Sequence, residues 1–328
     1  MKNENINNPV VFQRADPHIY LHTDGYYYMT ASVPAYDGIE IRRAKTIEGL
    51  EKGESKMVWM KHEKGEMSEL IWAPEIHVIG DKWYIYFAAA GNREIHKVDI
   101  TFNHRMYVIE NGDANPFSDN WVEKGRIETH MESFSLDATI LKYDDKVYYI
   151  WAQKDPKIEG NSNIYISEME NPWTLKGTIT MLTHPEYDWE KRVFSVNEGP
   201  SILKSDKHVF LTYSASATDE NYCIGILKME IGKDPLVKEN WKKSPVPVFR
   251  SDVPNKRFGP GHNSFTKSPE GQDILVYHCR DYDKFDCDPL YDPNRHTCIQ
   301  VVEWENGEPK FGIPLPLKRK LEDFLAGK

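Results

Sequence analysis

Apolar and polar positions alternate along the chain in a pattern that occurs five times. Each repeat begins with a short apolar segment that opens on an acidic residue or a histidine, passes through a polar turn, and continues into an aromatic strand. The opening residues are 59, 62, 61 and 64 positions apart, and they are Asp16, Glu75, Asp137, Glu198 and His262. This near-even interval indicates five similar units around one axis.

Each interval has room for four strands, the number that a propeller blade requires. In the first unit we predict strands over 16–21, 26–32, 38–44 and 56–60. In the last unit we predict the third and fourth strands over 297–304 and 309–313. The sequence therefore predicts an all-β fold, a five-bladed β-propeller with four antiparallel strands per blade, as a single domain over residues 1–328.

A large β-sandwich, or several small β domains, would also show short strands at regular spacing. The opening residues argue against these folds, because an acid buried in a dry sandwich core is costly. Around a propeller axis, the acids share a polar, water-filled funnel.

The second unit departs from the others through a long stretch between its second strand, 83–88, and its third, 104–110. Long loops in compact folds are usually functional. We expect this loop to shape the mouth of a pocket.

Composition narrows the possible partners. The chain has 41 Lys and Arg against 51 Asp and Glu, a net charge of -10, which argues against binding to the phosphate backbone of nucleic acids. A small neutral substrate fits better. The first residues lack the apolar segment of a secretory signal, and no stretch approaches the about 18 apolar residues of a membrane span. We therefore expect a cytoplasmic protein with no membrane association.

The four cysteines show no disulfide spacing, and three of them, Cys279, Cys287 and Cys298, lie near His278 and His296. This cluster suggests zinc, but no C-x2-C pair is present and buried free thiols are common. We reject a zinc site at these cysteines and expect no organic cofactor.

Three of the opening residues, Asp16, Asp137 and Glu198, are the residue types that glycoside hydrolysis needs. One carboxylic acid protonates the leaving oxygen, and one carboxylate activates water. A third carboxylate can raise the pKa of the acid by its negative charge, and strands that meet at an axis bring such groups together.

These residues and their surroundings resemble glycoside hydrolase family 43, the five-bladed propeller glycosidases that include arabinofuranosidases, arabinanases and xylosidases. The resemblance covers essentially the whole chain, and the motifs that carry it are Arg14-Ala15-Asp16-Pro17, Trp72-Ala73-Pro74-Glu75, Ser135-Leu136-Asp137-Ala138, Asn197-Glu198-Gly199-Pro200, Gly259-Pro260-Gly261-His262-Asn263 and Tyr277-His278-Cys279-Arg280. It implies that Asp16 is the general base, Glu198 the general acid, and Asp137 the residue that raises the pKa of the acid and positions it. The implied mechanism is inverting, with acid and base about 6.5 to 9.5 Å apart.

The resemblance also implies that His262 coordinates a hydrated calcium or sodium ion in the central channel. A neutral histidine bonded to ordered water is the alternative, since calcium prefers oxygen ligands. It further implies that Arg280 lies beside the acids, where its guanidinium pairs with Glu198 or a sugar hydroxyl; a surface salt bridge is the alternative. Trp72 is a candidate platform for a sugar ring, and Glu75 has no implied catalytic role.

The motif set looks most like intracellular α-L-arabinofuranosidases that release single arabinose units from short arabino-oligosaccharides, in the breakdown of arabinan or xylan. A β-xylosidase is the nearest alternative, followed by an endo-arabinanase. A propeller that binds sugars without hydrolysing them is an alternative of another class, because a fold alone does not determine function.

Overall fold

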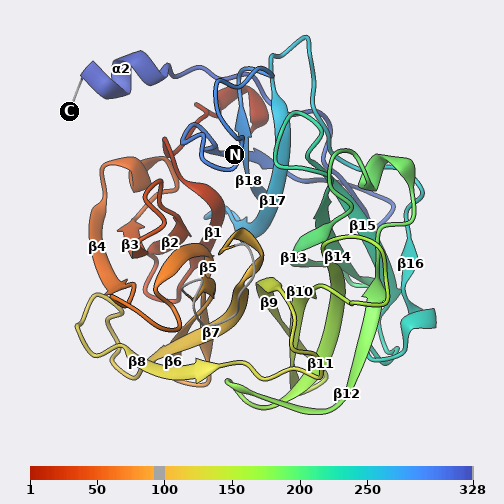
Figure 1. Ribbon diagram of the computed structural model, residues 1–328. Coiled ribbons are helices and arrows are strands. Elements are labelled where there is room, and N and C mark those ends of the chain that lie inside the picture. Colours follow the sequence, from red (N-terminus) through yellow and green to blue (C-terminus); the bar gives the residue numbers. More distant parts are fainter. Residues whose placement is uncertain (92–99, 327–328) are drawn as a thin grey trace.

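The computed structural model describes residues 1–91 and 100–326, and within them five antiparallel sheets follow one another around a common axis (Figure 1). The first strand of each sheet lies nearest the axis and packs against the first strands of the neighbouring sheets. The predicted five-bladed β-propeller is therefore confirmed.

Four blades have four strands each. The strands of the first two are β1 (Ala15–Leu21), β2 (Tyr27–Ser32), β3 (Gly38–Ala44), β4 (Glu54–Met60), β5 (Glu69–Ile79), β6 (Lys82–Ala90), β7 (His104–Asn111) and β8 (Val122–Arg126). Those of the third and fourth are β9 (Ser135–Tyr143), β10 (Lys146–Gln153), β11 (Asn163–Asn171), β12 (Thr174–Thr183), β13 (Asn197–Lys204), β14 (His208–Ala215), β15 (Cys223–Glu230) and β16 (Lys242–Lys243). Residues 92–99, the centre of the loop expected to shape a pocket mouth, lie outside the described residues.

Helices are short and lie in the connections between strands or near the termini. They are the 3-10 helices η1 (Asn3–Asn5), η2 (Glu48–Glu51), η3 (Ile100–Phe102), η4 (Asp188–Glu190) and η5 (Lys238–Asn240), and the α-helix α2 (Leu321–Ala326). None of the helices in the described parts of the chain has the length and apolar character needed to span a bilayer.

The hydrophobic core lies between the blades, where the faces of neighbouring sheets meet. Its largest cluster spans the second to fourth blades and is built on middle-strand aromatics such as Tyr86, Tyr149, Trp151 and Tyr213, all fully buried. Each fully buried large apolar side chain stabilises the fold by roughly 1.5–3 kcal/mol. The aromatic second strands seen in the sequence are thus the packing surfaces that hold the blades together.

The fifth blade differs from the prediction. Its sheet has three strands, β17 (Phe258–Lys267), β18 (Asp273–Arg280) and β19 (His296–Val301). The segment predicted as a third strand over 297–304 breaks at Val302, whose amide donates to the carbonyl of Asp273 at 2.8 Å. The end of the predicted third strand and the start of the predicted fourth, 309–313, instead form a separate hairpin of β20 (Glu303–Glu305) and β21 (Glu308–Lys310).

The outer edge of β19 is occupied by the N-terminal segment, which closes the ring. The amide of Val10 donates to the carbonyl of Thr297, and the amide of Thr297 donates to Val11, both at 2.9 Å. The buried side chain of Asn8 makes a further pair: its Nδ2 donates to the carbonyl of Ile299 at 2.8 Å, and its Oδ1 accepts from the amide of Ile299 at 2.9 Å. The two ends of the chain are therefore joined in one blade.

Replacing Asn8 by alanine removes both hydrogen bonds and leaves the buried amide and carbonyl of Ile299 unpaired. We expect Asn8→Ala to lower the free energy of unfolding by about 2–4 kcal/mol, because each unsatisfied buried group costs about 1–3 kcal/mol. Urea denaturation measures the change, and Asn7→Ala, at the exposed neighbouring residue, is the matched control. Equal stability of the two variants would show that this segment does not close the ring.

Candidate active site

An extra residue interrupts the pairing of the inner strand at one equivalent place in every blade, and the inner strands of the second and fifth blades each have one further bulge. At the five equivalent bulges one residue has a left-handed backbone, and these residues are Asp16 (φ 52°), Ala73 (φ 45°), Asp137 (φ 49°), Gly199 (φ 54°) and His262 (φ 41°). A bulge bends the strand and redirects a side chain. Left-handed backbone costs a residue other than glycine free energy, so it persists only where its surroundings enforce it.

The neighbouring blade supplies that enforcement by binding the backbone amide of the bulge. The amide of Asp16 donates to Nδ1 of His278 at 3.0 Å, that of Ala73 to Oγ of Ser32 at 2.8 Å, and that of His262 to Oγ of Ser214 at 2.7 Å. The amide of Gly199 donates to Oδ2 of Asp137 at 2.9 Å. Each bond joins two blades and satisfies a donor that the bulge has removed from the strand ladder.

The positions of the bulges show that the five opening residues are not all structurally equivalent. Asp16, Asp137 and His262 occupy equivalent positions, but Glu75 lies two residues beyond Ala73, and Glu198 lies one residue before Gly199. The spacing in the sequence could not separate these cases, because an acid near a bulge gives nearly the same interval as an acid at the bulge.

The structure brings the three carboxyl groups together in one pocket of about 340 Å³. Trp72 and His262 also line it, so five of the six predicted site residues lie in its wall. The indole of Trp72 stacks on the imidazole of His104, with ring centroids 3.7 Å apart. Around the rim lie Phe102 and Phe194, which are 40% and 46% exposed.

Asp16 is buried among groups that favour its ionised form. Its Oδ1 lies 3.3 Å from Nη1 of Arg295 and 3.4 Å from Nδ1 of His262, and its Oδ2 accepts a hydrogen bond from the hydroxyl of Ser32. Burial alone would raise the pKa of Asp16, but the Arg295 guanidinium and His262 outweigh burial and hold the pKa far below its ordinary value. Asp16 is therefore a carboxylate at all physiological pH values.

Glu198 has the opposite environment. Desolvation and the nearby charge of Asp137 raise the pKa of Glu198 to about 8, against the effect of Tyr222, whose hydroxyl donates to Oε1 of Glu198 at 2.8 Å. Burial and the negative charge of Asp16 likewise raise the pKa of Asp137. Glu198 therefore keeps its proton at neutral pH, while Asp16 does not.

Tyr222 and His278 connect the two sides of the pocket. Their rings stack with centroids 5.7 Å apart, so Tyr222 lies between Glu198 and the histidine that accepts the amide of Asp16. Burial lowers the pKa of His278 to about 3. Because Nδ1 of His278 accepts that amide, the proton of the neutral ring is on Nε2.

The position of Arg280 differs from the expectation. Its Nη1 donates to the carbonyl of Thr218 at 2.8 Å, and its Nε lies 3.4 Å from Oδ1 of Asp292, so the guanidinium braces the loops behind the pocket instead of pairing with Glu198. The arginine that lines the pocket is Arg295, at the start of β19. Arg295, like Tyr222, lies in a connecting segment without a repeated pattern, so no signal in the sequence pointed to either residue.

The surroundings of His262 do not match a calcium site built from protein ligands. Calcium takes about six to eight oxygen ligands, whereas His262 offers one imidazole whose Nδ1 lies 3.4 Å from Asp16 and 3.7 Å from Asp137. We derive no catalytic step from an ion at this position. Within the described residues, the group of three potential metal ligands is a different one, His18, Glu75 and His77.

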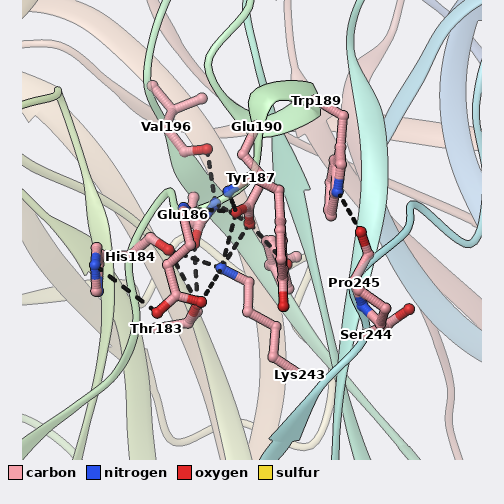
Figure 2. A network of polar contacts seen from close by, with 12 residues as sticks. Thr183, His184, Glu186, Tyr187, Trp189, Glu190, Val196, Lys243, Ser244 and Pro245 are labelled. Carbon is pink, nitrogen blue, oxygen red and sulfur yellow. Dashed lines mark hydrogen bonds and ion pairs between the residues drawn. The ribbon is translucent and has the colours of Figure 1, made fainter.

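A buried ion pair fixes the strand that carries Glu198 (Figure 2). Glu190, on η4, is fully buried, and its Oε1 lies 2.8 Å from Nζ of Lys243 on β16. The same carboxylate accepts hydrogen bonds from Nδ2 of Asn197 at 3.0 Å and from the hydroxyl of Tyr213 at 2.8 Å. Asn197 directly precedes Glu198, so this network determines where the acid lies.

Comparisons with known proteins found a matching family model, similar sequences and a similar structure. A family model described as "Glycosyl hydrolases family 43" matches residues 6–309. An "Extracellular exo-alpha-(1->5)-L-arabinofuranosidase" of Streptomyces avermitilis is 49% identical over 94% of this chain, and a protein of the same name from Streptomyces chartreusis is 47% identical over 86% of this chain and 84% of its own length. A crystal structure of an alpha-L-arabinofuranosidase from Lactobacillus brevis is 55% identical and covers 98% of this chain and 100% of its own, with a TM-score of 0.94.

The chain spans 63% of the length of the Streptomyces avermitilis relative. The expectation of a cytoplasmic protein is wrong, because both Streptomyces relatives are named extracellular. That expectation rested on the composition of the first residues, on the absence of a disulfide spacing and on the resemblance to intracellular enzymes.

Replacing Lys243 by methionine leaves the carboxylate of Glu190 buried without its cation. We expect Lys243→Met to lower the free energy of unfolding by about 3–5 kcal/mol, the usual cost of breaking a buried pair on one side. Chemical denaturation measures the change, with Lys242→Met at the exposed neighbouring lysine as the control, expected within about 0.5 kcal/mol of wild type. A Lys243→Met protein as stable as the control would contradict a structural role for the pair.

Proposed function

The chain belongs to glycosyl hydrolases family 43, and on that premise we propose that it releases terminal α-L-arabinofuranosyl residues from arabino-oligosaccharides with inversion at the anomeric carbon. The observation that carries this proposal is the pair of opposite environments in one pocket. Glu198 holds a proton at neutral pH and Asp16 is ionised. Glycoside hydrolysis by inversion requires one carboxyl group in each of these states.

In the proposed reaction, Glu198 donates its proton to the glycosidic oxygen as the bond from that oxygen to the anomeric carbon breaks. Asp16 accepts a proton from a water molecule, whose oxygen forms the new bond on the opposite face of the sugar ring. Glu198 ends as a carboxylate and Asp16 as an acid, so one proton has been given and one received. A proton exchange with solvent restores both.

Asp137 acts on the acid in two ways, one through a hydrogen bond to the neighbouring backbone and one through its charge. Its Oδ2 accepts the amide of Gly199, which fixes the backbone next to Glu198, and its charge favours the protonated form of Glu198. Arg295 and Ser32 hold Asp16 ionised and in place. Removing any of these groups therefore alters protonation or geometry without removing a reacting atom.

Removal of single terminal sugars is supported by the size of the pocket and by the relatives. A volume of about 340 Å³ is at the small end of the roughly 300–1,000 Å³ of ligand pockets. The name of the two Streptomyces relatives specifies exo action, an α-1,5 linkage and an extracellular location. We propose that this chain acts on the same linkage in substrates that it meets outside the cell.

The substrate assignment is tested with linear α-1,5-arabino-oligosaccharides and with the nitrophenyl glycosides of α-L-arabinofuranose and β-D-xylose. We expect arabinose to be the main product. Glu198→Gln should lower kcat/KM on the oligosaccharides by about 10²–10⁴-fold, the usual contribution of a general acid, and should lower it less on the nitrophenyl arabinoside, whose leaving group needs little protonation.

The control for this series is Glu220→Gln, at an exposed glutamate on the loop after β14, expected to retain wild-type kinetics. Predominant release of xylose would contradict the sugar assignment, and unchanged turnover by Glu198→Gln would contradict the acid. Sugar binding without hydrolysis by the wild type would instead indicate a non-catalytic propeller.

The pH profile tests the proposed protonation states. Activity requires protonated Glu198, so kcat/KM should fall as the pH rises through about 8. The hydroxyl of Tyr222 favours the carboxylate form, so Tyr222→Phe should raise the pKa of Glu198 and move this limb to higher pH. Tyr291→Phe, at a half-exposed tyrosine, is the control. A limb that moves to lower pH in Tyr222→Phe would contradict the assignment.

A further inference from the structure

A second polar cluster lies on the axis beneath the carboxyl groups of the pocket. Along β1, Asp16 lines the pocket, His18 follows, and Tyr20 lines a separate hollow. Along β5, Trp72 lines the pocket, Glu75 follows, and His77 lines the hollow. Along the two strands, His18 and Glu75 therefore lie between the residues that line the pocket and the residues that line the hollow.

The donor atoms of this cluster are close enough to share one ion. Nε2 of His77 lies 2.9 Å from Oε2 of Glu75, Nε2 of His18 lies 3.8 Å from the same oxygen, and one ligand atom from each residue fits within 4.8 Å of the others. Ligands of tetrahedral zinc, with bonds of about 2.0–2.1 Å, are about 3.4 Å apart. The separations of 2.9 Å and 3.8 Å from the Glu75 oxygen lie on either side of that value.

The histidine on β1 lacks a partner that would explain its burial. His18 is 8% exposed, its Nδ1 has no hydrogen bond to the part of the chain that the structure describes, and its Nε2 is too far from Glu75 for one. Buried polar groups are almost always satisfied, and an exception points to a bound water or ion.

We propose that His18, Glu75 and His77 bind one divalent transition-metal ion of the zinc class, which joins the first and second blades at the axis. Two imidazoles and one carboxylate are a ligand set that zinc adopts with three protein ligands and a fourth position for water. The single proton that His77 shares with Glu75 moves to the other ring nitrogen or to solvent when the ion binds.

The charges around the cluster select against hard cations. Glu75 is its single carboxylate, and Lys142, whose Nζ donates to the carbonyl of Val78 at 2.6 Å, acts electrostatically on His77. Calcium depends on several oxygen ligands and on negative charge, whereas zinc forms strong bonds to imidazole nitrogen. The hollow of about 300 Å³ that His77 lines together with Lys142 and Lys204 gives solvent access to the site.

The test is the binding of Zn²⁺ to the full chain after treatment with a chelator, followed by titration calorimetry with millimolar Ca²⁺ present. We expect one equivalent of Zn²⁺ to bind to wild type, and Glu75→Gln and His77→Ala each to weaken that binding at least tenfold. The matched control is His62→Ala, which removes a histidine with the same 2.9 Å contact to a carboxylate, Glu123, at the surface. It should bind as wild type does.

Two further measurements separate lost ligation from lost folding. The conservative variant His77→Gln, checked by circular dichroism, should also lose Zn²⁺ binding while folded. Zn²⁺ should raise the Tm of wild type and of His62→Ala but not that of Glu75→Gln. Wild type that binds no Zn²⁺, or folded Glu75→Gln and His77→Gln proteins that bind it as tightly as wild type, would overturn the proposal.

Discussion

The site depends on one local constraint, a bulge in each inner strand, whose freed amide in four of the five blades is bound by the adjacent blade. Without the bulge, the residue at its start would pair in the strand ladder; with it, Asp16 and Asp137 take left-handed backbone and lie in the wall of the axial pocket. The bonds from Asp16 to His278 and from Gly199 to Asp137 each cross between blades. The hydrogen bonds that join neighbouring blades are therefore also the bonds that position the carboxyl groups in the pocket.

This constraint also explains how similar carboxyl groups acquire different protonation states. The bulge of the first blade places Asp16 against Arg295. Arg295 directly precedes β19, the strand of the last blade to which the N-terminal segment bonds when it closes the ring. Glu198, one residue before its own bulge, is desolvated beside Asp137, and these two effects outweigh the hydroxyl of Tyr222 and the more weakly acting His262. Arginine favours the charged form on one side, and desolvation beside a like charge favours the neutral form on the other.

The structural features that could be predicted from the sequence are those that recur from blade to blade. Five blades, and the meeting of Asp16, Asp137 and Glu198 in one pocket, followed from recurring patterns, because every blade must bury an aromatic strand and turn an inner strand toward the axis. Features that occur in one blade only were missed or assigned to the wrong place. Arg295 comes from a loop with no counterpart in other blades, and Arg280, singled out by its motif, points away from the acids. The last blade was misread because its outer edge is completed by residues from the opposite end of the chain.

The most direct test of the account is the anomeric form of the arabinose first released, followed by proton NMR during hydrolysis of an α-L-arabinofuranoside. If Asp16 activates water while Glu198 protonates the leaving oxygen, the first product is the β-anomer, and the α-anomer appears only later by mutarotation. Initial release of the α-anomer would mean that a carboxylate attacks the sugar itself. That result would contradict the division of roles between the two groups.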